Sequence, residues 1–401
     1  MSAAALETPI YLDHHATTPC DPRVLDAMLP WFTESFGNPS SATHRFGWAA
    51  EAAVEDARER LARDIGASDS REIVFTSGTT ESDNLALQGV VRAAGGPASG
   101  HVVTSAVEHP AVLDACAALE RDGCEVTVVP VDGGGRVDPG AVAAALTERT
   151  RLVSVMAANG EIGVLEPLAE IGAVCRERGV LFHTDAAQMA GKLPLDVGAL
   201  GVDLLSMCAH KLYGPKGVGL LYVRERSPRI RLEPLLYGGG HERGRRSGTL
   251  PVPLVVGFAR AVELCLEEMP AEVERITALR ERLREGLADG LPDARVNGDP
   301  ERRLPGNLNV CIPGVEADAL IAALKDVALS AGSACASASG EPSHVLRAIG
   351  LSDSAARASL RFGLGRSNTP EQVERVVQRV LEEVGALRER SPGAGRRLSG
   401  N

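Results

Sequence analysis

An excess of basic residues is missing from this sequence. Its 401 residues include 42 Lys and Arg against 53 Asp and Glu, and the formal net charge is −11. Surfaces that bind nucleic acids are rich in Lys and Arg, because these residues neutralise phosphates. The charge balance therefore gives no support to a nucleic-acid-binding protein, and we expect no direct contact with nucleic acid.

Membrane-spanning segments and a leader pattern are also missing. No apolar run approaches the roughly 20 residues that a spanning helix needs. The first residues, MSAAALETPIYLD, do not place a basic segment before an apolar one, so we expect no signal peptide. Both absences argue against direct membrane contact.

Paired cysteines are the third absence. The eight cysteines are scattered, and no two of them form a Cys-x-x-Cys pair; they lie at positions 20, 116, 124, 175, 208, 265, 311 and 335. This spacing argues against a zinc site or a disulfide framework and favours a reducing compartment, the cytoplasm. We expect no bound metal, and we expect most of these thiols to be small core residues.

What the sequence does contain is an alternation of apolar runs and helical patterns. With 44% hydrophobic residues, the 401-residue chain can fill two domains. Strand-like runs lie at 10–13, 72–76, 101–105, 125–131, 152–157, 180–183, 202–207 and 219–223, and helical patterns at 49–65, 83–93, 110–121, 139–148 and 167–178. This alternation predicts an α/β fold with a mostly parallel sheet, covered by helices, whose ligands bind at the carboxyl ends of the strands.

A second region follows the alternating part. Helical patterns at 255–268 and 271–287 predict two helices. After them come a strand-like run at 308–312, a helical pattern at 316–325 and a final one at 370–388. The last residues, 391–401, are rich in Gly, Arg and Ser and predict a disordered tail.

Two apolar runs end in residues that suit pyridoxal phosphate (PLP) chemistry. The run at 202–207 leads to Lys211, and the run at 180–183 leads to Asp185 and Gln188. A lysine at the inner end of a buried strand loses hydration, which favours the neutral amine that attacks a carbonyl. The lysine would form the Schiff base, and the carboxylate would keep the pyridine nitrogen protonated. The plain alternative is a strand that surfaces, with Lys211 in water.

The turn after the run at 72–76 has the pattern of an anion site. It reads SGTTES, from Ser77 to Ser82, and a helical pattern follows it. Free backbone N–H groups and the helix dipole favour a phosphate at such a helix start. Simple N-capping by Ser77 or Thr80 explains the pattern equally well.

Two further loops have unusual compositions. The stretch from Gly238 to Thr249, GGGHERGRRSGT, is basic and glycine-rich, as expected for a contact with an anion or a neighbouring subunit, although a solvated loop has the same composition. The stretch from Ser330 to Gly340, SAGSACASASG, surrounds Cys335 with small residues. It is either a flexible linker or a mobile arm that carries a thiol to chemistry elsewhere.

Together these stretches resemble the cysteine desulfurases, PLP enzymes of the class V aminotransferase type. The resemblance runs from about residue 10 to about residue 390 and rests on YLDHHATTP, FGNPSS, HRFGW, EIVFTSGTTESDN, EHPAVLD, HTDAAQ, HKLYGPKG, GGGHERGRRSGT, GSACASAS and LRFGLGR. The GSACASAS loop is similar to that of the longer-loop, housekeeping group. The resemblance implies fold type I, with a large PLP-binding domain over 15–262 and a smaller α+β domain over 1–14 plus 263–390.

The resemblance also assigns the catalytic residues. Lys211 would be the Schiff-base lysine, and Cys335 would receive the substrate's sulfur as a persulfide. His109 would stack on the cofactor ring and shuttle protons. A free thiol is only a few per cent ionised at neutral pH, so its deprotonation needs help, and His109 is the nearest candidate.

The remaining roles concern binding. A guanidinium such as that of Arg361 suits the substrate carboxylate because it binds in a bidentate manner. The implied cofactor contacts are Thr79, Thr80 and His210 with the phosphate, Asp185 with the pyridine nitrogen, Gln188 with the ring oxygen, and Thr249 from the partner subunit of a homodimer. Asn159 would contact the substrate.

Two positions depart from the family's pattern. The usual Asn-Asn-Glu is here Asn159-Gly160-Glu161, so one asparagine contact with cofactor and substrate is missing. Cys208 stands where the family has a serine that binds the phosphate.

The implied reaction converts L-cysteine to L-alanine and passes the sulfur of the Cys335 persulfide to an acceptor. That acceptor is an iron–sulfur scaffold protein, a nucleic acid that becomes thiolated, or a cofactor precursor. A selenocysteine lyase on the same fold is the nearest alternative. A plain aminotransferase is a weaker alternative, because its reaction does not use a thiol such as that of Cys335. The non-enzymatic hypothesis is a sulfur-assembly platform without catalytic activity.

Overall fold

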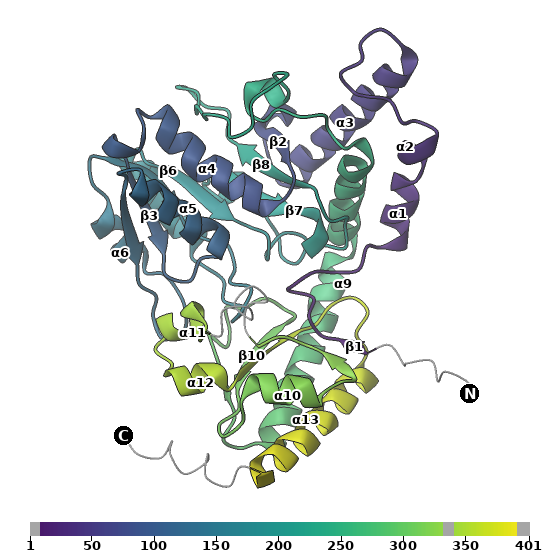
Figure 1. Cartoon of the computed structure of the whole chain (residues 1–401), viewed down its shortest axis with the longest axis vertical. Helices are drawn as coiled ribbons and strands as arrows, with labels where there is room; N and C mark the ends of the chain where they lie inside the picture. Colours follow the sequence, from purple (N-terminus) through teal and green to yellow (C-terminus); the bar gives the residue numbers. More distant parts are fainter. Residues whose placement is uncertain (1–8, 332–340, 391–401) are drawn as a thin grey trace.

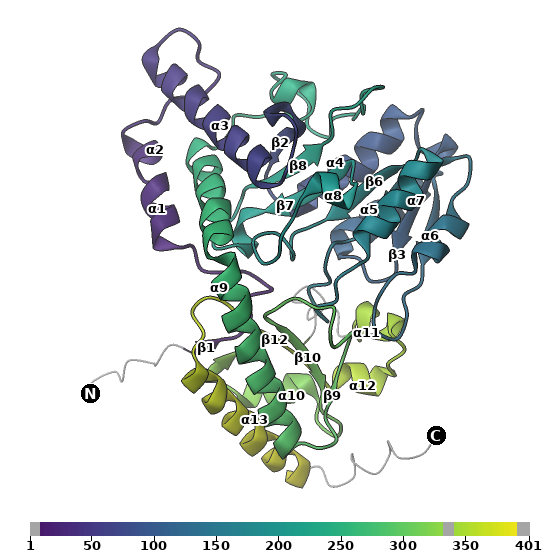
Figure 2. The ribbon, with the colours of Figure 1, turned by 180° about the vertical axis from the view of Figure 1, so that it is seen from behind.

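The computed structural model describes residues 9–331 and 341–390. Cys335 with most of its small-residue loop, and the tail at 391–401, lie outside the described residues. Three sheets organise the chain, of seven, three and two strands. In Figures 1 and 2 the seven-stranded sheet occupies the upper part of the molecule and the smaller sheets occupy the lower part.

The larger sheet has the strand order β2-β8-β7-β6-β5-β3-β4. Its strands are β2 (Ile73–Thr76), β3 (His101–Ser105), β4 (Glu125–Val129), β5 (Thr150–Ser154), β6 (Leu181–Asp185), β7 (Leu204–Cys208) and β8 (Gly219–Val223). Only β8 is antiparallel to its neighbours, β2 and β7. The other neighbouring pairs are parallel, so the predicted mostly parallel sheet is confirmed.

Helices cover both faces of this sheet. They are α3 (Arg45–Asp64), α4 (Thr79–Ala93), α5 (Pro110–Arg121), α6 (Pro139–Ala145), α7 (Leu168–Arg178) and α8 (Val197–Leu200). The first two helices, α1 (Pro22–Met28) and α2 (Pro30–Thr33), pack instead on α9 (Val252–Gly290). Successive strand residues face opposite sides. Val74 accordingly packs with α4 and α5, while Phe75 joins the core under α3 and α7. Figure 1 shows α4 and α5 in front, and Figure 2 shows α7 and α8.

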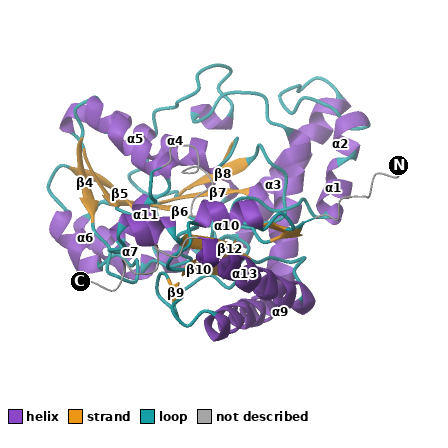
Figure 3. Cartoon of the chain, turned by 60° about the horizontal axis from the view of Figure 1, so that its bottom comes forward, coloured by secondary structure: helices purple, strands orange, loops and turns teal. Residues whose placement is uncertain are grey.

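The smaller part is α+β. An antiparallel sheet has the order β12-β10-β9, formed by β9 (Arg295–Val296), β10 (Asn307–Cys311) and β12 (Ser359–Gly363). A parallel pair joins β1 (Ile10–Tyr11) to β11 (Val327–Ala328). The helices are α10 (Ala317–Ala323), α11 (His344–Ala348), α12 (Asp353–Arg357) and α13 (Pro370–Arg390). Figure 3 shows α10 and α13 in front of β10 and β12.

One long helix connects the two parts, and it corrects a prediction. We expected two helices between 255 and 287, yet α9 (Val252–Gly290) is continuous over 39 residues and contains Pro270. Proline costs a helix one hydrogen bond. Packing outweighs that cost, because Phe258 lies in the core of the larger part and Leu283 lies in the core of the smaller part. The expected domain boundary at residue 262 falls inside this helix, and the division into 15–262 and 1–14 plus 263–390 stays a prediction.

The other differences concern element ends. Strand and helix bounds shift by a few residues, and α4 begins at Thr79 rather than at 83. The turn before α4 is thus shorter than expected, and its threonines belong to the first turn of the helix. Within the described part of the chain, no helix is both long enough and apolar enough to cross a membrane.

Candidate active site

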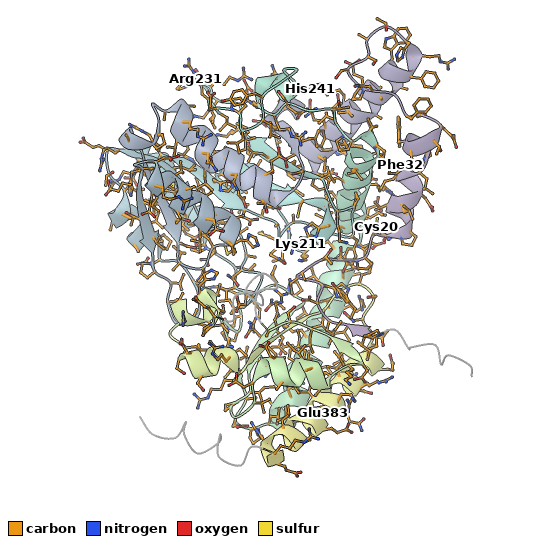
Figure 4. The ribbon with its side chains drawn as sticks, viewed as in Figure 1. Cys20, Phe32, Lys211, Arg231, His241 and Glu383 are labelled. Atoms are coloured by element: carbon orange, nitrogen blue, oxygen red, sulfur yellow. The ribbon has the colours of Figure 1, made fainter. Side chains whose placement is uncertain are left out.

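A cavity of about 600 Å³ lies between the larger sheet and the smaller part of the molecule. Figure 4 shows Lys211 at this level, between the two parts. The expected site residues that line the cavity are Thr79, Thr80, His109, Asn159, Asp185, Gln188, Cys208, His210, Lys211 and Arg361. Thr249 is exposed and does not line it, and Cys335 lies outside the described residues. Residues from distant strands therefore meet in one place, as expected for a parallel sheet.

Lys211 ends a single turn of 3₁₀-helix, Ala209–Lys211, directly after the buried strand β7. Its Nζ donates to the carbonyl oxygens of His15 at 2.6 Å and Ala16 at 2.8 Å. Burial lowers the pKa of the Lys211 amine, and the charge of Arg361 adds to this effect. A lowered pKa raises the share of neutral amine at neutral pH, which is the form that attacks a carbonyl.

Asp185, the last residue of β6, provides a buried carboxyl. Its Oδ1 accepts the Ala187 N–H at 2.8 Å. Burial raises the pKa of this carboxyl, and the Ala187 N–H, His109 and Lys211 oppose the rise. A buried carboxyl of this kind is stabilised in its charged form by a cationic N–H partner.

The start of α4 forms the opposite end of the cavity. Its N-cap residue, Gly78, supplies no side-chain hydrogen bond to the first turn. Thr79 Oγ1 is buried and has no hydrogen-bond partner among the described residues. A Cβ on Gly219 would lie 2.7 Å from the Cα of Gly78, so β8 holds this turn closely. Backbone N–H groups and a hydroxyl without a partner suit a phosphate.

His210 completes the phosphate end. Its Nδ1 contacts Thr17 Oγ1 at 3.2 Å. Burial lowers its pKa to about 4, so the ring is neutral at pH 7. A neutral imidazole can donate a hydrogen bond to a phosphate oxygen without adding a buried charge.

These groups fit pyridoxal phosphate. A buried amine, a buried carboxyl and an uncapped helix start match the aldehyde, the pyridine nitrogen and the phosphate of the cofactor, respectively. Among residues 9–331 and 341–390, no group of three His, Cys, Asp or Glu side chains is placed to hold a metal ion. The amine, the carboxyl and the helix start together form the donor set of an organic cofactor.

Gln188 is held in one orientation by its neighbours. Its Oε1 is contacted by His15 Nδ1 at 3.0 Å and by Lys192 Nζ at 3.2 Å. Its Nε2 donates to the His15 carbonyl at 3.0 Å. Because an amide oxygen only accepts, Nε2 must be the end that can donate its second hydrogen to a ring oxygen.

Gly160, the departure from Asn-Asn-Glu, is explained by the position of Gln188. A Cβ at position 160 would lie 2.8 Å from Gln188 Nε2 and 3.0 Å from its Cδ. Side-chain contacts this short force one of the two groups to move. The glycine therefore makes room for the amide that faces the cavity.

Gly160→Ala should displace the Gln188 amide and weaken cofactor binding about tenfold, as expected for one lost hydrogen bond. Gln188→Ala should have the same effect and should also change the cofactor's absorbance. Fluorescence titration with pyridoxal phosphate measures both. The control is Gly133→Ala, because a Cβ there meets no atom within 4 Å. Unchanged affinity in both cavity variants would show that another group supplies the bond.

Arg361 and Asn159 differ in whether a polar side-chain atom is left without a hydrogen-bond partner. Arg361 Nη2 pairs with Asp13 Oδ1 at 2.7 Å, and Nη1 donates to the Gly160 carbonyl at 3.0 Å. Its Nε is buried without a hydrogen-bond partner in the described chain. Asn159 instead uses Oδ1 for two backbone N–H groups and Nδ2 for the Val107 carbonyl. Arg361 can therefore still bind a carboxylate, whereas Asn159 shapes the turn.

The cavity residues without a role assigned from the sequence include His15, Glu161 and His344. His15 is part of the HHATTP motif, and Glu161 is part of Asn-Gly-Glu. The sequence therefore showed both motifs but not that these two side chains line the cavity. Burial raises the pKa of Glu161 to about 7, and both its oxygens lack hydrogen-bond partners among the described residues. No sequence signal singles out His344, which begins the short helix α11.

The sequence and the fold of this chain are similar to those of known proteins. Residues 10–376 match the aminotransferase class-V family. A solved NifS-like protein has a TM-score of 0.88 and 36% identity, covering 94% of this chain and 100% of that one. The structure described as SspA in complex with cysteine has a TM-score of 0.79 and 38% identity, covering 88% and 98%. Fold and donor set together define a pyridoxal-phosphate-dependent enzyme of fold type I.

The sequence narrows this class further. Cysteine desulfurase IscS of Anaeromyxobacter sp. (strain Fw109-5) is 58% identical over 387 residues, which are 96% of this chain and 95% of the relative. The chain belongs to the cysteine desulfurases of the class V aminotransferase family.

Proposed function

We propose that this protein converts L-cysteine to L-alanine and transfers the sulfur through a persulfide on Cys335. The observation that carries the proposal is the meeting of Lys211, Asp185 and Arg361 in one cavity. The Arg361 guanidinium suits the carboxylate of an amino acid. The Lys211 amine suits Schiff-base chemistry, and the Asp185 carboxyl suits a pyridine nitrogen. The similarity to a protein solved with cysteine supports the choice of substrate.

The chain's own residues have separate tasks in this reaction. The bound cofactor supplies the electron sink for the substrate's carbon skeleton. Arg361 orients the carboxylate, and Lys211 removes the proton from the substrate's Cα. The Cys335 thiolate forms a bond with the substrate's sulfur while the Cβ–S bond breaks. The electron pair of that bond stays on the carbon skeleton and Cβ takes up a proton. Lys211 returns a proton to Cα, which completes alanine.

The direct test incubates the purified, cofactor-loaded protein with L-cysteine and a thiol reductant. We expect alanine and sulfide in equal amounts, with L-serine as the unreactive control. Turnover of selenocysteine but not of cysteine would instead identify a selenocysteine lyase. A colourless protein that forms no alanine would identify a non-catalytic platform.

Exposed aromatic residues on α2, on the start of α3 and between the two helices support a homodimer. Phe32, Phe36, Phe46 and Trp48 are each about half exposed, at 54%, 63%, 48% and 55%. The rings of Phe36 and Phe46 stack with their centroids 5.3 Å apart, and Figure 1 shows α2 and α3 at one end of the larger part. Large exposed apolar side chains of this kind mark a protein interface. We propose that a second copy covers them and supplies Thr249 to the neighbouring cavity.

Replacing Phe32 and Trp48 together by Asp should dissociate the dimer. A hot-spot aromatic contributes about 2 kcal/mol, so losing two of them should raise the dissociation constant about a thousandfold. Sedimentation velocity over a concentration series measures the change. The control is Val128→Asp, another half-exposed apolar residue, on the edge strand β4. A wild type that sediments as a monomer would contradict the proposal.

The sulfur acceptor and the compartment complete the proposal. We propose an iron–sulfur scaffold protein as the acceptor, because the chain is 58% identical to a protein named IscS. We propose the cytoplasm as the compartment. The seven cysteines within the described residues are all free thiols, which agrees with a reducing environment.

A further inference from the structure

Two histidines face the cavity from different elements and make different hydrogen bonds. His109 is the N-cap of α5, and its Nδ1 accepts the Ala111 N–H at 3.1 Å. His344 is the first residue of α11, and its Nε2 lies 3.0 Å from the carbonyl oxygen of Glu108. The partners differ in kind, since one is a donor and the other is an acceptor.

These partners set opposite tautomers in the neutral rings. Because Nδ1 of His109 accepts an N–H, its single proton lies on Nε2, and the ring can only donate from there. Burial lowers the pKa of His109, which keeps it neutral at pH 7. His344 must donate its Nε2–H to the Glu108 carbonyl, because a carbonyl oxygen only accepts. Its Nδ1 then carries a lone pair, and Nδ1 has no hydrogen-bond partner in residues 9–331 and 341–390.

Thiol chemistry in this cavity needs a proton acceptor. A free thiol has a pKa of about 8.5 and is mostly protonated at pH 7. The cavity makes ionisation harder, since burial raises the pKa of Cys208, a thiol in its wall. His109 was the candidate base from the sequence, yet its accepting nitrogen is already occupied by the start of α5.

We propose that His344 is the catalytic proton acceptor for a thiol in this cavity. His109 acts there only as a hydrogen-bond donor. In the step, the S–H bond breaks, its electron pair stays on sulfur, and the proton forms a bond to His344 Nδ1. His109 keeps its Nε2–H, which can only donate a hydrogen bond in the cavity. The inference rests on the proposed function and assigns the thiol's proton to His344.

Other titratable or charged side chains share the cavity with His344 and have to be weighed against it. They are His15, Glu81, Glu108, His109, Glu161, Asp185, Cys208, His210, Lys211, Lys216 and Arg361. Glu108 Oε1 accepts from Ser105 and the Met156 N–H, and its Oε2 has no hydrogen-bond partner among the described residues. Burial raises the pKa of this carboxyl to about 8, so it is largely protonated at pH 7 and does not accept a proton there. On its own helix, Arg347 pairs with Asp353 outside the cavity. Glu161 is the competitor that the experiment must include.

The test compares His344→Gln with His344→Ala across pH 6 to 9.5. Glutamine keeps a donor for the Glu108 carbonyl but has no basic nitrogen, whereas alanine loses both. We expect both variants to form alanine about 100- to 10,000-fold more slowly at pH 7, the range for a positioned acid–base group. Both should recover to within about threefold of wild type at pH 9.5, where thiols ionise unaided. The cofactor's absorbance change on adding cysteine should be unaffected.

Several outcomes would overturn the assignment. A Gln variant with the wild-type rate and pH profile, beside a slow Ala variant, would show that His344 only supports the Glu108 carbonyl. A pH-dependent loss in Glu161→Gln, with none in His344→Gln, would move the role to that carboxyl. A wild type that forms no alanine from cysteine would instead refute the proposed function, so the two failures are distinguishable.

Discussion

Lys211→Ala should reduce alanine formation from L-cysteine by at least about a thousandfold, within the range that a positioned acid–base group contributes. It should also abolish the absorbance band that the cofactor shows when it is joined to a lysine. The reason is that one amine both binds the cofactor and moves the substrate's Cα proton. Its Nζ has contacts only 2.6 and 2.8 Å long with two carbonyls of the 14–19 segment, so it is held in place before any ligand binds.

Two matched variants separate the amine's chemistry from its charge. Lys211→Arg keeps a positive charge but cannot form a Schiff base, so it should be as inactive as the alanine variant. Lys325→Ala removes an exposed lysine in the smaller part and should leave rate and spectrum unchanged. Stopped-flow absorbance and alanine assays measure both properties. An Lys211→Ala protein that keeps the wild-type rate would refute the assignment.

Cys335→Ser should separate the two halves of the reaction. Cofactor binding and removal of the Cα proton use Lys211 and Asp185, so the variant should keep its colour and still change spectrum with cysteine. Sulfur transfer needs a thiolate, and a serine hydroxyl is not an equivalent nucleophile. Sulfide and persulfide formation should therefore fall at least about a thousandfold, as expected for loss of a nucleophile that acts together with its base.

Mass spectrometry locates the sulfur directly. After a brief exposure of the wild type to cysteine, the peptide that contains Cys335 should carry one added sulfur atom. Cys20→Ser is the matched control, because Cys20 is an exposed thiol and should be dispensable. Added sulfur on Cys208 or Cys311, together with an active Cys335→Ser variant, would contradict the mechanism.

The sequence alone determined the architecture of the larger part and predicted the residues that we propose for the cofactor. Alternating apolar and helical patterns are local signals, and the parallel order they predict brings strand ends to one edge of the sheet. Lys211 and Asp185 follow two adjacent strands, β7 and β6, and therefore had to lie close together. The start of α4 could be recognised as an anion site for the same reason, since its donors are consecutive backbone groups.

Packing between distant segments decided what local patterns could not. In the sequence, Pro270 predicts a helix boundary. In the structure, α9 is continuous because two separate hydrophobic cores bury the turns on either side of Pro270. Gly160 reads as a lost contact, but the structure shows that a side chain there would collide with Gln188. In both cases the deciding atoms belong to residues that no sequence window contains.

The roles of the two cavity histidines in proton transfer could be inferred only from the tertiary structure. The role of a histidine follows from which of its nitrogens is already occupied, and that depends on its hydrogen-bond partners. The partner of His109 is two residues away, whereas His344 meets a carbonyl 236 positions earlier in the chain. The sequence could therefore identify His109 as a site residue, but only the folded chain assigned a donor and an acceptor to the two rings.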